Sequence, residues 1–288
     1  MAKVPDGVDV QELTIVARKV LLDGLTALER HLDALTVVGA QAVYLQTAEV
    51  PLATAAYTSD GDVGVDPQQL ADEPLLEQAL RSAGFERLQQ HQPGLWGRTE
   101  TVGDTPTKVE LDLLVGQTLA EGGNRSVKIQ PHDKMAARRV PGLEPTVVDR
   151  TLMTVAALEP GDDRRIQVHV AGAAALLVAK AHKIHDRLND SAARPDRLTN
   201  KDAGDVYRLM MGTRVREVGN TFRRLLADPR VGGVTATGLA YLREQFGGAD
   251  TAGIRLAIEA LAGSIPESTI RAAAPAYIRA LPIPGKIS

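Results

Sequence analysis

Segments that alternate like β-strands are confined to roughly the first 170 of the 288 residues, and the remainder of the chain has the pattern of helices separated by glycines. This contrast predicts an α+β protein with two domains, an α+β lobe over residues 1–170 and a helical lobe over residues 171–288. The strands that we expect lie at residues 36–39, around Asp60, and at residues 85–88, 95–99, 108–115, 127–130 and 166–170.

Helices are expected where apolar residues recur at helical spacing or where capping residues mark a helix end. The first runs from about Val10 to Leu35, with Gly24 as a point of interruption. The others expected before residue 212 begin at Ala40, run from Pro74 to Ala83, run from Ala173 to Arg187, and follow Asn200 as far as Met211.

The composition excludes several classes of protein. The chain contains no cysteine, which excludes a disulfide scaffold and thiolate zinc sites. Apolar residues make up 44% of the chain and so provide ample core, but no apolar run is long enough to span a membrane. The N-terminus also lacks a charged start followed by an apolar signal core. We therefore expect a soluble cytoplasmic protein without a membrane partner.

Asp60 and Asp62 are spaced two residues apart in the segment Thr58-Ser-Asp-Gly-Asp62. In an extended strand, side chains at positions i and i+2 lie on the same side, so both carboxylates would point the same way. Two like charges held close together are costly unless a cation lies between them, and Mg²⁺ prefers oxygen ligands. The pair therefore predicts a metal site; the alternative is that Asp-Gly-Asp forms a simple turn.

A second acidic strand strengthens the metal hypothesis. Residues 108–115 alternate, so that aliphatic side chains share one face and Glu110 and Asp112 share the other. If this strand pairs beside the Asp60 strand, a third carboxylate joins the site, and we expect Asp112 to supply it, with Glu110 as its rival. Three carboxylates suit phosphoryl transfer by two Mg²⁺ ions, one activating the attacking oxygen and the other stabilising the triphosphate.

The helix expected from Ala173 places Lys180, Lys183 and Arg187 along the margin of an apolar stripe. Lys180 could reach inward and contact nucleotide phosphates, or it could extend to solvent from a buried stem. Asp202 and Asp205 lie in the first turns of the next expected helix, where the helix dipole alone favours acidic residues.

Taken in order, these elements resemble the nucleotidyltransferase superfamily, and within it the toxins of the AbiEii and MenT kind. The shared features are the turn Val38-Gly39-Ala40-Gln41 opening a helix, Thr/Ser-x-Asp-x-Asp on a strand, a distant acidic strand, and later a lysine and an arginine on one helix followed by Lys-Asp on the next. The resemblance covers roughly residues 30 to 212. It implies a nucleotidyltransferase-like mixed-sheet lobe with a C-terminal helical lobe.

The resemblance also carries roles onto individual residues. It implies that Asp60, Asp62, Lys180 and Asp202 are catalytic, that Asp60, Asp62 and Asp112 hold metal, and that the nucleotide contacts Gly39, Thr58, Ser59, Lys180 and Arg187. Lys180 is preferred because it stands seven residues before Arg187, although Lys183 and Asp205 form a competing register of equal separation. Three residues depart from the family pattern, namely Ala40 in place of a second Gly or Ser, Gly61 in place of an aliphatic residue, and Ala56 where many relatives have an arginine.

The resemblance further implies a Mg²⁺-dependent transfer of a nucleoside monophosphate from an NTP to a tRNA 3′ end, and a cognate antitoxin. The net charge of −3 does not by itself suggest a nucleic-acid partner. However, arginines gather mainly in the second half of the chain and could line a groove for RNA. The alternative is that these arginines lie on solvated helix faces. Two further alternatives are a small-molecule nucleotidyltransferase of the antibiotic-modifying sort and a non-catalytic binding module on the same fold. The arginines concerned are Arg138, Arg139, Arg164, Arg165, Arg187, Arg208, Arg214, Arg216, Arg223 and Arg224.

Overall fold

The computed structural model describes residues 7–49, 58–123, 125–194 and 198–285. The chain divides into two compact units. The first comprises Met1–Ala42, Ala56–Val140 and Arg150–Ala171, and the second comprises Val43–Ala55, Pro141–Asp149 and Gly172–Ser288. The second unit thus takes in two short segments that precede residue 171, in addition to the helical region.

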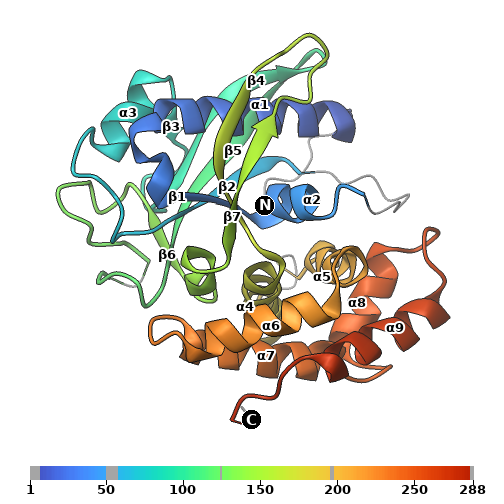
Figure 1. Cartoon of the computed structure of the whole chain (residues 1–288). Coiled ribbons are helices and arrows are strands. Elements are labelled where there is room, and N and C mark those ends of the chain that lie inside the picture. Colours follow the sequence, from blue (N-terminus) through green and yellow to red (C-terminus); the bar gives the residue numbers. More distant parts are fainter. Residues whose placement is uncertain (1–6, 50–57, 124, 195–197, 286–288) are drawn as a thin grey trace. The chain divides into compact units, whose positions relative to one another are not determined.

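The first unit is built on a mixed β-sheet, in which eight strands are described (Figure 1). The strand order is β3-β4-β5-β2-β1-β8-β7, with β6 pairing on β5. Pairs β1–β8, β2–β5 and β5–β6 are parallel, and the remaining pairs are antiparallel. The strands are β1 (Leu35–Val38), β2 (Asp60–Val65), β3 (Glu86–Arg87), β4 (Leu95–Val102), β5 (Thr105–Gly116), β6 (Arg138–Val140), β7 (Arg150–Ala156) and β8 (Arg165–Ala171).

The helices lie in both units, and those after residue 171 follow one another with short connections. At this level the mixed α/β architecture agrees with the sequence expectation. The helices are α1 (Val10–Ala27), α2 (Gly39–Gln46), α3 (Leu76–Ser82), α4 (Ala173–Asp190), α5 (Lys201–Gly212), α6 (Val215–Ala227), α7 (Gly232–Phe246), α8 (Ala252–Ala260) and α9 (Glu267–Ala280), with 3₁₀ helices η1 (Glu29–Ala34) and η2 (Glu144–Val147).

Two sequence expectations about strands were wrong. Residues 127–130 form no strand; Val127 is buried, so its apolar character reflects packing rather than extended pairing. Strands β6 and β7 were not expected. The first has only three residues, and the second is an edge strand whose Leu152 is 55% exposed, so neither carries the alternation that sequence patterns detect.

The N-terminal helix is shorter than expected and is not interrupted at Gly24. Helix α1 ends at Ala27, and η1 follows before β1 begins at Leu35. Gly24 is buried inside α1, where an added Cβ would lie 2.5 Å from Leu111 Cδ2 on β5. The glycine therefore allows the helix to approach the sheet closely, rather than ending the helix.

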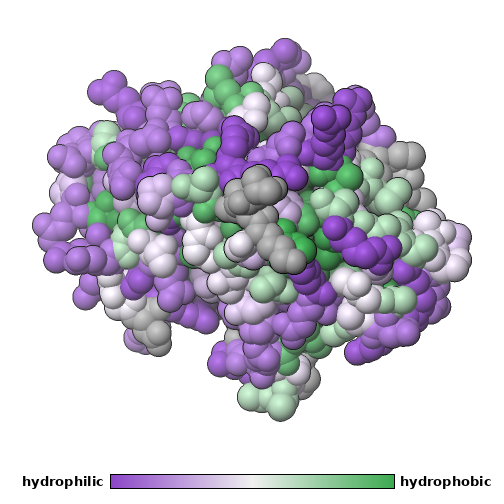
Figure 2. Space-filling view, turned by 60° about the horizontal axis from the view of Figure 1, so that its bottom comes forward, coloured by the Kyte–Doolittle hydropathy of each residue, from purple (hydrophilic) through white to green (hydrophobic). Residues whose placement is uncertain are grey.

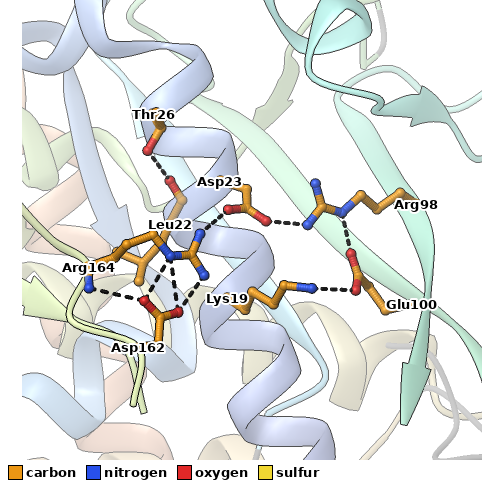
Figure 3. A network of polar contacts seen from close by, with 8 residues as sticks. All are labelled: Lys19, Leu22, Asp23, Thr26, Arg98, Glu100, Asp162 and Arg164. Atoms are coloured by element: carbon orange, nitrogen blue, oxygen red, sulfur yellow. Dashed lines mark hydrogen bonds and ion pairs between the residues drawn. The ribbon is translucent and has the colours of Figure 1, made fainter. Parts of the chain in front are cut away.

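An ion-pair network joins α1 to the sheet (Figure 3). Asp23 on α1 contacts both Arg98 on β4 and Arg164 before β8, and Arg164 also pairs with Asp162. One helical turn away, Lys19 pairs with Glu100 at 2.8 Å. The network connects three segments that are far apart in the sequence.

Replacing Asp23 by asparagine is expected to lower the free energy of unfolding by about 1 kcal/mol, because the central carboxylate of the network is lost. The effect is modest because the Asp23 side chain is partly exposed, so that solvent screens its charge. The loss should shrink as salt concentration rises. Denaturant unfolding at low and high salt measures both effects. The control is Asp104→Asn, which changes an exposed carboxylate on the β4–β5 turn and should leave stability unchanged.

In the second unit, α5, α6 and α7 pack against α4. Gly238 on α7 lies directly against Val178, where an added Cβ would be 2.7 Å from Val178 Cγ1, and Gln245 Nε2 donates to the carbonyl of Ala181 at 3.0 Å.

No helix in the described part of the chain is long and apolar enough to cross a membrane. On the face seen in Figure 2, apolar residues form small patches scattered among hydrophilic ones.

Candidate functional site

The two acidic strands predicted from the sequence are neighbours in the sheet. Strand β2 pairs in parallel with β5, and the register places Asp60 beside Glu110 and Asp62 beside Asp112. Paired residues of adjacent strands point to the same face, so all four carboxylates share one face of the sheet. Because Leu111 packs against α1, this acidic face is the one that points away from α1.

The four carboxylates influence one another electrostatically. Asp112 is only 8% exposed; burial raises its pKa to about 6, Arg138 opposes this rise, and Glu110 and Asp60 add to it. Burial also raises the pKa of Glu110, and the nearby charges of Asp60 and Asp62 contribute. Accumulated negative charge of this kind is relieved when a cation binds.

A guanidinium already contacts this cluster. Arg138 Nη2 donates to Asp112 Oδ2 at 2.7 Å. The other two atoms that could complete the pair, Asp112 Oδ1 and Arg138 Nε, are buried and have no hydrogen-bond partner among the described residues. Arg138 was expected only as one of many arginines, and its contact with Asp112, 26 positions away, carries no local sequence signal.

Gly39 lies directly beside Asp62. Strand β1 pairs antiparallel with β2, with Val38 opposite Asp62, and Gly39 then begins α2 with a φ of 65°. An added Cβ on Gly39 would lie 1.9 Å from Asp62 Oδ2. Glycine is therefore required twice, for the left-handed backbone and for the space that the Asp62 carboxylate occupies. The predicted turn and the predicted metal ligand meet at this point.

Thr58 and Ser59, expected to contact phosphate, are both buried. The Thr58 hydroxyl donates to Asp60 Oδ1 at 2.5 Å, and the Thr58 backbone N–H donates to Thr14 Oγ1 at 3.2 Å. In this arrangement Thr58 orients the Asp60 carboxylate.

The donor set on the acidic face suits a hard divalent cation, because it consists of carboxylate oxygens and one of them, Asp112 Oδ1, is buried without a partner among the described residues. However, in the part of the chain that the structure describes, no group of three or more His, Cys, Asp or Glu side chains is placed to hold a metal ion. The metal centre therefore stays a prediction, and the carboxylates would have to turn toward a shared ion.

The residues predicted in the second half form a separate ion-pair cluster within the second unit. Lys180 Nζ donates to Asp202 Oδ1 at 2.7 Å and to Asp205 Oδ2 at 2.6 Å. Asp202 also accepts from Arg187 at 2.6 Å and pairs with Lys183 at 3.1 Å. The side chains of Lys180, Asp202 and Asp205 are each at most 6% exposed.

This geometry answers one question that the sequence left open. Lys180 does not extend to solvent, so that alternative is wrong. Lys180 contacts both Asp202 and Asp205, and Lys183 contacts Asp202, so the choice between the two registers stays a prediction.

The charges in the cluster stabilise one another. Burial acts to lower the pKa of Lys180, but Asp202 and Asp205 outweigh it and raise this pKa well above its usual value. Burial acts to raise the pKa of Asp202, but Lys180, Lys183 and Arg187 hold this pKa far below its usual range. The two carboxylates take up two of the three N–H donors of the Lys180 ammonium.

Several of the arginines expected to line an RNA groove have partners within the protein. Arg208 Nε donates to Thr47 Oγ1 at 2.8 Å, and its guanidinium lies 5.5 Å from the centre of the Tyr44 ring, so Arg208 joins α5 to α2. Arg214, the N-cap of α6, and Arg223 within α6 contact residues three positions away. The contacts of Arg214 and Arg223 are of the kind found on solvated helix faces.

The chain gave no significant match to any protein-family model, curated protein or solved structure.

Proposed function

We propose that the chain is a metal-dependent nucleotidyltransferase that transfers a nucleoside monophosphate from an NTP to an acceptor hydroxyl, on a nucleotidyltransferase-like fold. The observation that carries the proposal is the pairing of β2 with β5, which sets Asp62 beside Asp112 on one face while Gly39 lies against Asp62. Carboxylates on neighbouring strands beside a glycine turn at a helix N-terminus suit a metal-bound triphosphate.

Each residue of the acidic face, and each of its neighbours Thr58 and Gly39, has a stated part in this proposal. Asp60, Asp62 and Asp112 would hold Mg²⁺, with Glu110 as the alternative third ligand. Thr58 orients Asp60 through its hydroxyl, and the Gly39 turn lets backbone N–H groups approach phosphate without a side chain in the way. When bound, the divalent ions supply neutralisation of the triphosphate and activation of the acceptor hydroxyl.

The identity of the acceptor rests on the sequence resemblance alone. We propose a tRNA 3′ end, a toxin role that blocks translation, and a cognate antitoxin that restrains it. These partners place the protein in the cytoplasm, where NTPs, Mg²⁺ and tRNA are available.

Incubation with each labelled NTP and Mg²⁺, in separate reactions with total tRNA and with small cationic acceptors, tests the proposal directly. We expect label on tRNA with the native protein and with Asp104→Asn, and loss of label with Asp62→Asn, which preserves side-chain shape but removes a charged ligand. Label on a small cationic acceptor, with none on tRNA, would instead indicate an antibiotic-modifying enzyme. Equal labelling by native protein and Asp62→Asn would contradict the assignment of the site.

A second candidate is a non-catalytic binding module on the same fold. The specific observation that favours it is the ion pair between Arg138 and Asp112, which neutralises one carboxylate without a metal ion. Under this hypothesis no NTP and acceptor combination would give transfer.

A further inference from the structure

Arg138 belongs to the acidic face by the register of its strand. Strand β6 pairs in parallel with β5, and Arg138 lies beside Leu114, two residues after Asp112. Positions two apart on β5 share a face, so the Arg138 side chain lies on the same side of the sheet as Glu110 and Asp112. Its side chain is 16% exposed, so it is largely but not fully enclosed.

The pair between Arg138 and Asp112 is incomplete. An arginine and a carboxylate usually form two parallel hydrogen bonds, whereas here only Nη2 and Oδ2 meet, at 2.7 Å. Asp112 Oδ1 and Arg138 Nε remain buried without a hydrogen-bond partner among the described residues. Buried polar atoms without partners are costly, so the arrangement does not satisfy either group fully.

Arg139, the next residue of β6, has hydrogen-bond acceptors for all three of its guanidinium nitrogens. Arg139 Nε and Nη2 both donate to the carbonyl of Gln117, at 3.0 and 2.5 Å, and Nη1 donates to the carbonyls of Gly122 and Gly123. Arg139 therefore holds a loop together, whereas the one hydrogen bond of Arg138 goes to a carboxylate of the acidic face.

We propose that Arg138 is an exchangeable counter-ion, which pairs with Asp112 in the absence of a divalent cation and turns to the triphosphate of the NTP when a cation takes Asp112. The proposal rests on the proposed function and extends it by assigning the cation that contacts phosphate. Guanidinium suits this exchange because its planar array of donors matches carboxylate and phosphate equally well.

Metal binding to the nucleotide-free protein tests the exchange without any reaction. Removing Arg138 removes a competitor for Asp112, so Arg138→Gln should bind Mn²⁺ about tenfold more tightly, as followed by the electron paramagnetic resonance signal of free Mn²⁺. The same variant should bind inorganic tripolyphosphate with Mg²⁺ about tenfold more weakly, because a phosphate contact is lost. Arg139→Gln is the matched control and should change neither affinity.

Opposite changes in the two affinities would support the exchange, and a purely structural role would not produce them. If both affinities fall together or neither changes, while the native protein binds Mn²⁺ and transfers label, the exchange is wrong and the proposed function stands. If the native protein binds no Mn²⁺, the proposed function and the exchange fail together.

A measurement on the native protein follows Arg138 directly, and a variant is needed only to assign its signal. The Nε–H signal of Arg138 in a nitrogen-15 NMR spectrum, assigned by its loss in Arg138→Lys, should shift when Mg²⁺ is added and shift again when tripolyphosphate follows. A signal that stays in place through both additions would overturn the proposal.

Discussion

Replacing Lys180 by methionine is expected to lower the free energy of unfolding by about 3–5 kcal/mol, the largest effect on stability that we expect of any single change. Lys180 is buried and its ammonium contacts both Asp202 and Asp205. Methionine fills a similar volume, but the Asp205 carboxylate stays buried and loses the lysine ammonium that contacts it. Chemical denaturation of the purified variant, monitored by circular dichroism, measures the change.

Lys183→Met is the matched control for this prediction. Lys183 also pairs with Asp202, but its side chain is 41% exposed, so its removal should cost less than about 1 kcal/mol. The comparison also separates two roles of Lys180. If Lys180 serves mainly to contact the triphosphate, Lys180→Met will remain as stable as the Lys183 variant and lose only activity, and our structural assignment will be wrong.

The parts of the site that could be predicted from the sequence are those coded by short segments. Asp60 and Asp62 on one strand and Glu110 and Asp112 on another follow from alternation within a few residues, and their pairing was a reasonable extension. The long helix around Lys180 was likewise clear from its composition, because local propensity and packing agree there.

The parts that could not be predicted depend on contacts between distant residues. Arg138 meets Asp112 only because β6, a strand of three residues, adds to the far side of β5. Lys180 meets Asp205 because α4 and α5 pack closely, which no spacing within either helix reveals. Helical periodicity placed Lys180 at the margin of the apolar stripe, but the depth of its burial depends on how α5 packs and on the carboxylates that α5 supplies.

Replacing Gly39 by alanine is expected to reduce nucleotidyl transfer by about a hundredfold or more, if the proposed function holds. An alanine Cβ would lie 1.9 Å from Asp62 Oδ2, so the Asp62 carboxylate must move away from its place beside Asp112 on the acidic face. The same change should weaken Mn²⁺ binding to the nucleotide-free protein. Both measurements use the assays described for Asp62 and Arg138.

Gly84→Ala distinguishes this displacement from the backbone effect. Gly84 has a φ of 81°, similar in sign to the 65° of Gly39, but an added Cβ there meets nothing within 4 Å. Both variants should lose about 1 kcal/mol from the left-handed backbone, as seen in denaturation. Only Gly39→Ala should also lose Mn²⁺ affinity and activity. Equal behaviour of the two variants in metal binding and transfer would show that the position of Asp62 beside the glycine turn does not matter to the site.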